Sequence, residues 1–242
     1  MKYSPYSFSK INTFFDCQKK FELTYVNKVA IDRDYTDPTY FVRGRFLHAY
    51  IANRLKGGNG MKLKGYNAVD TDDKLNLVEY ADSTLENEYI GLTYDFNINM
   101  IEAYISLDKN LEPARNKALS VIGGYIDYFA IQDDYAMMVD WKTGRYHSHP
   151  RYTQLELYAI WLFQSYPEIT EIDLVFYYVE HNKFNIKTVV PSDVETLKNE
   201  LMDKIDFIEN TDTFNTNDSI HCIKCPFFNT CMDEYGVTGL NT

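Results

Sequence analysis

The sequence predicts an α/β (α+β) fold: a central mixed β-sheet flanked by helices, with an N-terminal helical part and a C-terminal cysteine cluster closing onto it. Two observations support this prediction. Apolar residues follow helical spacing before residue 90 and alternate with period two in several segments after residue 96. The four cysteines are split between the two ends, with Cys17 near the start and Cys222, Cys225 and Cys231 near the end. The two ends are therefore expected to meet.

The N-terminal part reads as three helices. Residues 7–26 carry apolar side chains at helical spacing after polar starting residues, and this helix includes Cys17. Pro38 opens a second helix that continues to Leu55, where a glycine-rich loop at residues 57–60 ends it. An acidic helix is expected over residues 72–89. The loop lacks the strand and the Lys-Ser/Thr pair of a phosphate-binding loop.

The pattern of residues 97–209 predicts the order βββαββα. The expected strands and helices, in chain order, are strands 97–107, 119–131 and 135–141, helix 152–164, strands 172–179 and 184–190, and helix 192–209. A polar stretch then leads to the three clustered cysteines. We therefore expect one domain over residues 1–242, divided into a helical part (1–90), a core (95–209) and a cluster-binding segment (210–242).

Composition narrows the classes of function. The net charge of −11 argues against broad electrostatic adhesion to nucleic acid or to an anionic membrane surface. No apolar run is long enough to cross a bilayer, so no membrane partner is expected. The chain has 21 tyrosines and 15 phenylalanines, whose rings can pack a core or stack on bases.

The cysteine pattern predicts a metal centre. Residues 1–20 contain no apolar segment of the secretory kind, so a cytoplasmic, reducing location is expected and two disulfides are disfavoured. Structural zinc sites more often pair two short Cys-x2-4-Cys hooks, whereas one distant cysteine with a Cys-x2-Cys-x5-Cys group favours a [4Fe-4S] cluster. Zinc and four unrelated thiols remain the alternatives.

Charged residues interrupt two apolar strands. Asp127 lies within the second predicted strand, and Asp140 and Lys142 lie two residues apart on the third, so that they share one face. Neighbouring hairpin strands can bring the three together. Two carboxylates can hold Mg²⁺ or Mn²⁺, and the ammonium can orient water or stabilise developing negative charge. A structural salt bridge between strand residues is the alternative.

These residues resemble the PD-(D/E)XK nuclease superfamily. Asp127 followed by residues 140–144, Asp-Trp-Lys-Thr-Gly, is similar to its metal-binding strand and lysine motif. Gly44 and His48 resemble the G-x-x-x-H motif of the RecB-like branch, and Gln154 with Tyr158 resembles its Q-x-x-x-Y motif. The resemblance spans residues 7–231. It implies a restriction-endonuclease-like core.

The resemblance also implies roles for these residues. His48, Asp127 and Asp140 would ligate the divalent metal, and Lys142 would assist the water or the transition state. Gln154 and Tyr158 would position the substrate or Lys142. Glu102 resembles an acidic position found in some members.

The split cysteines are similar to those of the iron-sulfur RecB-like nucleases, which include the AddB C-terminal nuclease and CRISPR-associated exonucleases. In that branch the cluster is structural and binds the N-terminal helix to the C-terminus. The expected cofactors are therefore a [4Fe-4S] cluster held by four cysteines and Mg²⁺ or Mn²⁺. The cluster ligands are Cys17, Cys222, Cys225 and Cys231.

The expected function is that of a metal-dependent DNA nuclease, an exonuclease preferring single strands or free ends, in a prokaryotic or phage-infected cell. It would serve recombination, repair, phage replication or CRISPR adaptation, with a helicase, recombinase or adaptation protein as partner. A DNA-binding adaptor subunit with weak catalysis is the alternative. Tyr146 and Tyr152 are expected to stack on bases. The candidate phosphate contacts are Lys19, Lys20, Arg43, Arg45, Arg145 and Arg151.

Overall fold

A computed structural model describes residues 1–31, 39–58, 71–87 and 96–240. Two details of the expected helices lie outside these ranges: the start at Pro38 and part of the glycine-rich loop. The acidic helix, expected to reach residue 89, ends earlier, at Leu85. Within the described ranges, no helix combines the length and the apolar character needed to cross a bilayer.

The sheet has five strands in the order β1-β2-β3-β4-β5. β3 and β4 pair in parallel and every other neighbouring pair is antiparallel, so the predicted mixed α/β sheet is confirmed. A restriction-endonuclease-like fold agrees with this arrangement. The strands are β1 (Ile98–Leu107), β2 (Ile122–Gln132), β3 (Tyr135–Lys142), β4 (Glu171–Tyr178) and β5 (Lys183–Val189).

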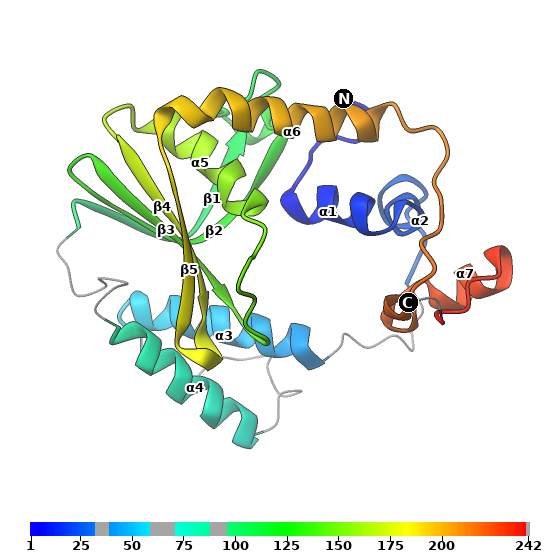
Figure 1. Ribbon diagram of the computed structural model, residues 1–242, viewed down its shortest axis with the longest axis horizontal. Coiled ribbons are helices and arrows are strands. Elements are labelled where there is room, and N and C mark those ends of the chain that lie inside the picture. Colours follow the sequence, from blue (N-terminus) through cyan, green and yellow to red (C-terminus); the bar gives the residue numbers. More distant parts are fainter. Residues whose placement is uncertain (32–38, 59–70, 88–95, 241–242) are drawn as a thin grey trace.

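Helices cover both faces of the sheet (Figure 1). α3 (Thr39–Leu55) and α4 (Thr71–Leu85) lie on one face, and α5 (Thr153–Ser165) and α6 (Val194–Glu209) lie on the other. Each face has its own apolar core, built around Trp141 and Tyr50 on the α3 side and around Phe129 and Leu155 on the α5 side. α5 connects the parallel strands β3 and β4, as such a connection requires a crossover.

The sheet forks in its middle. β2 and β3 pair only from Tyr128–Val139 to Gln132–Tyr135, whereas β1–β2 pairing continues to Ile122 and β3–β4 pairing continues to Lys142. Beyond the last β2–β3 pair the two halves of the sheet diverge. The predicted acidic residues lie at this divergence, so the fork determines where the site is.

The first predicted helix is interrupted, which corrects the expectation of one helix over residues 7–26. α1 (Phe8–Asp16) ends at Cys17, whose backbone is extended with φ −160° and ψ 110°, and α2 (Gln18–Phe21) and a π-helical turn (Glu22–Val26) follow. Lys19 N donates to Asn215 O at 3.0 Å, and Asn215 N donates to the Gln18 side chain at 3.1 Å. The C-terminal segment therefore supplies hydrogen bonds at the break.

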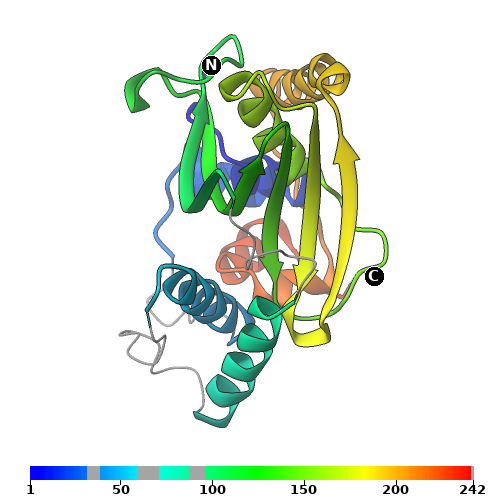
Figure 2. The same cartoon turned by 90° about the vertical axis from the view of Figure 1, so that its left-hand side faces the viewer.

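The C-terminal segment lies beside the N-terminal helices (Figures 1 and 2). It contains a 3-10 helix (Ile220–Lys224) and α7 (Phe228–Tyr235), neither of which was expected from the sequence. Phe227, Cys231 and Val237 form a small apolar core with Leu23 of the π-helical turn. This core attaches the end of the chain to its beginning.

Candidate active site at the fork of the sheet

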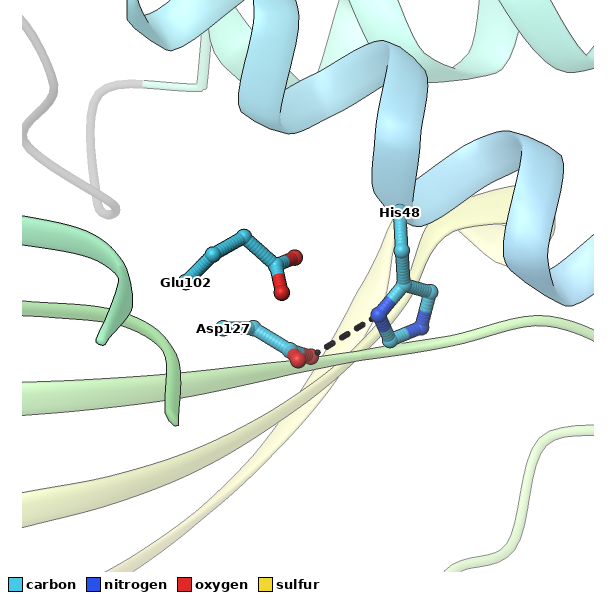
Figure 3. Close-up of side chains that lie close together, drawn as sticks. All are labelled: His48, Glu102 and Asp127. Carbon is cyan, nitrogen blue, oxygen red and sulfur yellow. Dashed lines mark ion pairs between the residues drawn. The ribbon is translucent and has the colours of Figure 1, made fainter. Parts of the chain in front are cut away.

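Three side chains from three elements converge at the fork: His48 from α3, Glu102 from β1 and Asp127 from β2 (Figure 3). One ligand atom from each lies within 4.8 Å of the other two. His48 Nδ1 lies 3.2 Å from Asp127 Oδ2, which also accepts a hydrogen bond from Trp141 N at 3.0 Å. We call these three residues the acidic triad. Its donor set, one imidazole and two carboxylates, is one that divalent metals accept.

Irregular backbone on two strands produces this convergence. In the β1–β2 register Ile101 faces Tyr128 and Ala103 faces Ile126, so Glu102 and Asp127 lie opposite each other. Glu102 has a positive φ of 55°, and the alternation of side chains changes phase at both positions. A local irregularity of this kind re-aims side chains, and here both carboxylates point toward His48.

Asp140 and Lys142 form the second part of the site. Asp140 is buried, and Lys142 Nζ lies 2.6 Å from its Oδ2. Among the described residues, Asp140 Oδ2 has no hydrogen bond of normal geometry. Lys142 Nζ also lies 4.8 Å from the centre of the Phe176 ring. A buried carboxylate needs a compensating cation, and Lys142 supplies one here.

The predicted ligand set differs from the observed grouping in one member. The prediction combined His48 and Asp127 with Asp140, whereas the compact group contains Glu102 in that place. Asp140 is engaged by Lys142 instead. The physical reason is the positive φ of Glu102, which turns its carboxylate toward the other two side chains.

The pKa values of the site reflect crowded carboxylates. Burial, followed by the charge of Asp127, raises the pKa of Asp140 to about 6. The same two causes raise the pKa of Glu102. Burial alone would lower the pKa of His48, but the hydrogen bond and charge of Asp127 outweigh it and raise this pKa to about 9. A bound cation would relieve the repulsion among the carboxylates, so the residues present fit a divalent metal.

Gln154 and Tyr158 lie on α5, which faces the sheet from the side opposite α3. Tyr158 is buried beside Gly124, where a Cβ atom would lie only 2.4 Å from Tyr158 Oη. Burial raises the pKa of Tyr158 to about 12; the Gln154 side chain opposes this rise, and the charges of Asp140 and Asp127 add to it. The tyrosine hydroxyl is therefore neutral and sensitive to both carboxylates.

A cavity of about 670 Å³ opens beside the acidic triad. Gly44, one turn before His48 on α3, lies close to β3, and a Cβ there would meet Thr143 Oγ1 at 3.3 Å. The cavity is lined by Tyr40, Phe41, Gly44, Arg45, His48, Ala49, Ala52, Glu102 and Thr143.

The four cysteines are all free thiols. Burial and the other three cysteines raise the pKa of Cys231 to about 11, and burial also raises the pKa of Cys225. Cys222 and Cys225 pack against the same small apolar core that contains Cys231. Across the described ranges, however, no three of the sulfur atoms lie within 4.8 Å of one another.

Several predicted substrate contacts have other partners. Arg43 forms ion pairs with Asp73 at 2.9 Å and with Glu180 at 3.1 Å. Tyr146 packs edge-on against Tyr178, and Tyr152 stacks on Phe176. Lys19 pairs with Glu22 at 2.5 Å. Arg145 and Arg151 are exposed in the loop after β3, together with His147 and His149.

Sequence reasoning missed Glu180 and His181, which hold this loop. Glu180 Oε1 accepts a hydrogen bond from Gly144 N at 3.0 Å, and His181 Nε2 lies 3.0 Å from Gly144 O. Both residues follow β4, parallel to β3, so their proximity to Gly144 depends on sheet order. No local pattern in the sequence indicates it.

The fold and site together define a class: an α/β protein with an imidazole, clustered carboxylates and a lysine at a forked sheet, a combination suited to metal-assisted hydrolysis. Comparison with known proteins identifies the family. The PD-(D/E)XK nuclease superfamily matches residues 5–232, and the chain belongs to it. Membership indicates a nuclease, and this superfamily typically uses Mg²⁺ or Mn²⁺, in agreement with the acidic triad.

Two further comparisons add little. No curated protein matches the sequence significantly. A solved structure titled "Crystal structure of SSO0001" matches with 15% sequence identity and a TM-score of 0.37, covering 84% of this chain and 98% of the other.

Proposed function

We propose that this protein is a metal-dependent DNA nuclease of the RecB-like, iron-sulfur branch, acting as an exonuclease on single strands or free ends. The observation that carries the proposal is the convergence of the acidic triad with Asp140 and Lys142 at the fork. We further propose a role in recombination, repair, phage replication or CRISPR adaptation, with a helicase, recombinase or adaptation partner supplying the strand.

The metal-binding residues are proposed to be His48, Glu102 and Asp127, with Asp140 as a further ligand. The burial of Asp140 and the repulsion among the carboxylates support this assignment. When bound, Mg²⁺ or Mn²⁺ supplies charge neutralisation at a phosphate oxygen and acidifies water. Trp141 N, by donating to Asp127, fixes the orientation of that carboxylate.

Lys142 is proposed to stabilise the negative charge that develops on the phosphate during attack by water. Its ammonium is held by Asp140 and lies over Phe176, so its position is set before the substrate binds. A preorganised charge of this kind lowers the barrier without reorganisation during the reaction. Gln154 and Tyr158 are proposed to position the substrate or Lys142. Tyr158 is buried and senses the charges of Asp140 and Asp127.

Digestion of end-labelled single- and double-stranded DNA with Mn²⁺ tests the proposal. We expect progressive shortening of the single strand, and a loss of at least about hundredfold in Lys142→Ala. Lys187→Ala is a matched control, because Lys187 is also ion-paired with a carboxylate at 2.6 Å, that of Glu156 on α5. Cleavage unaffected by Lys142→Ala would refute the mechanism. Mn²⁺ binding without cleavage by the unaltered protein would favour an adaptor role.

The four cysteines are proposed to hold a [4Fe-4S] cluster. The split of one distant cysteine from a Cys-x2-Cys-x5-Cys group supports this proposal over a zinc site. An anaerobically purified sample is expected to be brown and to absorb near ~400 nm through the charge-transfer bands of the cluster. A colourless sample containing zinc would refute the cluster.

A further inference from the structure

We propose that Tyr40 and Phe41 form a stacking platform for an unpaired nucleotide of the substrate strand; this inference rests on the proposed nuclease function. The two residues lie in the first turn of α3, and their side chains are 51% and 49% exposed. Their ring centroids are 4.4 Å apart at an interplanar angle of 37°. Two large, half-exposed rings side by side offer a flat apolar surface on which a base can stack.

The platform opens into the same cavity as the proposed metal site. Tyr40 and Phe41 line the cavity of about 670 Å³ together with His48 and Glu102 of the acidic triad. This volume lies within the range of about 300–1,000 Å³ that is usual for ligand sites. His48 follows Phe41 by seven residues, so the platform is about 10 Å from it along the axis of α3. A strand resting on the rings therefore reaches the site of hydrolysis within a short distance.

Positive charge accompanies the rings. Arg45 lines the cavity, and Lys224 Nζ lies 5.9 Å from the centre of the Tyr40 ring. Lys224 belongs to the 3-10 helix that carries Cys222, so the C-terminal segment contributes to the substrate path. Rings for bases and cations for phosphates are the usual combination for unpaired nucleic acid.

The exposed faces of these rings favour an unpaired strand over a duplex. In a duplex the faces of all internal bases are covered by their neighbours, so only a frayed or single-stranded end can stack on a protein ring. Tyr146 and Tyr152, the rings first expected to do this, are packed against Tyr178 and Phe176. Tyr40 and Phe41 take over that expected role.

Binding of a fluorescein-labelled oligothymidylate, measured by anisotropy in EDTA, tests the platform separately from catalysis. We expect Phe41→Ala to weaken binding about tenfold, since the loss of one base–ring contact has an effect of that size. The matched control is Phe207→Ala on α6, across the sheet, where the ring is 56% exposed and stacked on Phe15. The control is expected to bind within twofold of the unaltered chain.

Two further measurements separate stacking from charge. Phe41→Ala is expected to leave the salt dependence of binding unchanged. Lys224→Ala is expected to reduce the slope of log affinity against log salt concentration by about one, since one fewer counterion is released. Equal binding by the Phe41→Ala and Phe207→Ala variants would overturn the platform, as would equal affinity of the unaltered chain for a blunt duplex. If the unaltered chain binds the strand and shows this pattern but never cleaves it with Mn²⁺, the nuclease proposal fails and the platform stands.

Discussion

Replacement of Gly124 by alanine should destabilise the protein through a contact with one atom, Tyr158 Oη. A Cβ at Gly124 would lie 2.4 Å from this oxygen and 3.1 Å from the ring atoms Cε1 and Cζ. The hydroxyl would have to move about 1 Å to reach the 3.4 Å of ordinary contact. Because Tyr158 is buried on α5, the ring cannot leave without disturbing the core around it.

The expected cost follows from two opposing effects. Overpacking of a tight core costs about 1–3 kcal/mol, and replacing glycine by alanine at an unstrained backbone returns about 0.4–1 kcal/mol. We therefore expect Gly124→Ala to lower the free energy of unfolding by about 1–2 kcal/mol. In the Tyr158→Phe background the closest contact disappears and only the 3.1 Å contacts remain. There the same substitution should cost less than about 1 kcal/mol.

Urea unfolding of the four proteins of this double-mutant cycle, followed by circular dichroism, measures the coupling. We expect an interaction energy of about 1 kcal/mol between the two positions. Gly44→Ala is the control: its Cβ meets only Thr143 Oγ1, at 3.3 Å, and alanine favours the interior of α3, so stability should be unchanged or higher. Additive costs within about 0.3–0.5 kcal/mol would refute the proposed contact between β2 and α5.

Three other predictions concern the two proposed metal centres. The pKa of His48 is raised to about 9, so at pH 7.5 its imidazole is protonated and a binding metal must displace that proton. Mn²⁺ titration in buffers of different ionisation enthalpy should show the release of close to one proton per bound ion. The affinity for Mn²⁺ should rise with pH up to about 9. The same proton release from the His48→Gln variant would contradict this assignment. Glu102→Gln should weaken Mn²⁺ binding at least about tenfold in calorimetry, and unchanged affinity would remove Glu102 from the ligand set. Cys17→Ser should lower iron content and thermal stability first, with activity lost as a consequence, whereas lost activity at full iron content and stability would contradict a structural role.

Most of the core could be predicted because its determinants are local. Alternating apolar residues predicted all five strands, and helical spacing predicted α3, α5 and α6, with boundaries differing by a few residues. The break at Cys17 could not be predicted, because Asn215, which hydrogen-bonds to Gln18 and Lys19 directly after it, is 198 residues away. α7 was missed because it is only 8 residues long and follows an irregular, cysteine-rich stretch.

The candidate site was predictable to the extent that it consists of charges in apolar strands. Asp127, Asp140 and Lys142 stood out for this reason, and all three lie at the fork. The place of Glu102 in the compact group depends on its positive φ and on the β1–β2 register, neither of which is visible in the sequence. The roles of these residues remain predictions that the experiments above address.

The fork explains how the proposed metal ligands and Lys142 can lie close together although their strands are not hydrogen-bonded to each other at this point. Glu102 and Asp127 belong to the β1–β2 half, whereas Asp140 and Lys142 belong to the β3–β4 half. Pairing between the halves stops at Tyr128 and Val139, immediately before the acidic residues. The hydrogen bond from Trp141 N to Asp127 is a polar link across this divergence. The spacing between the acidic triad and Lys142 therefore depends on the splay of the two halves.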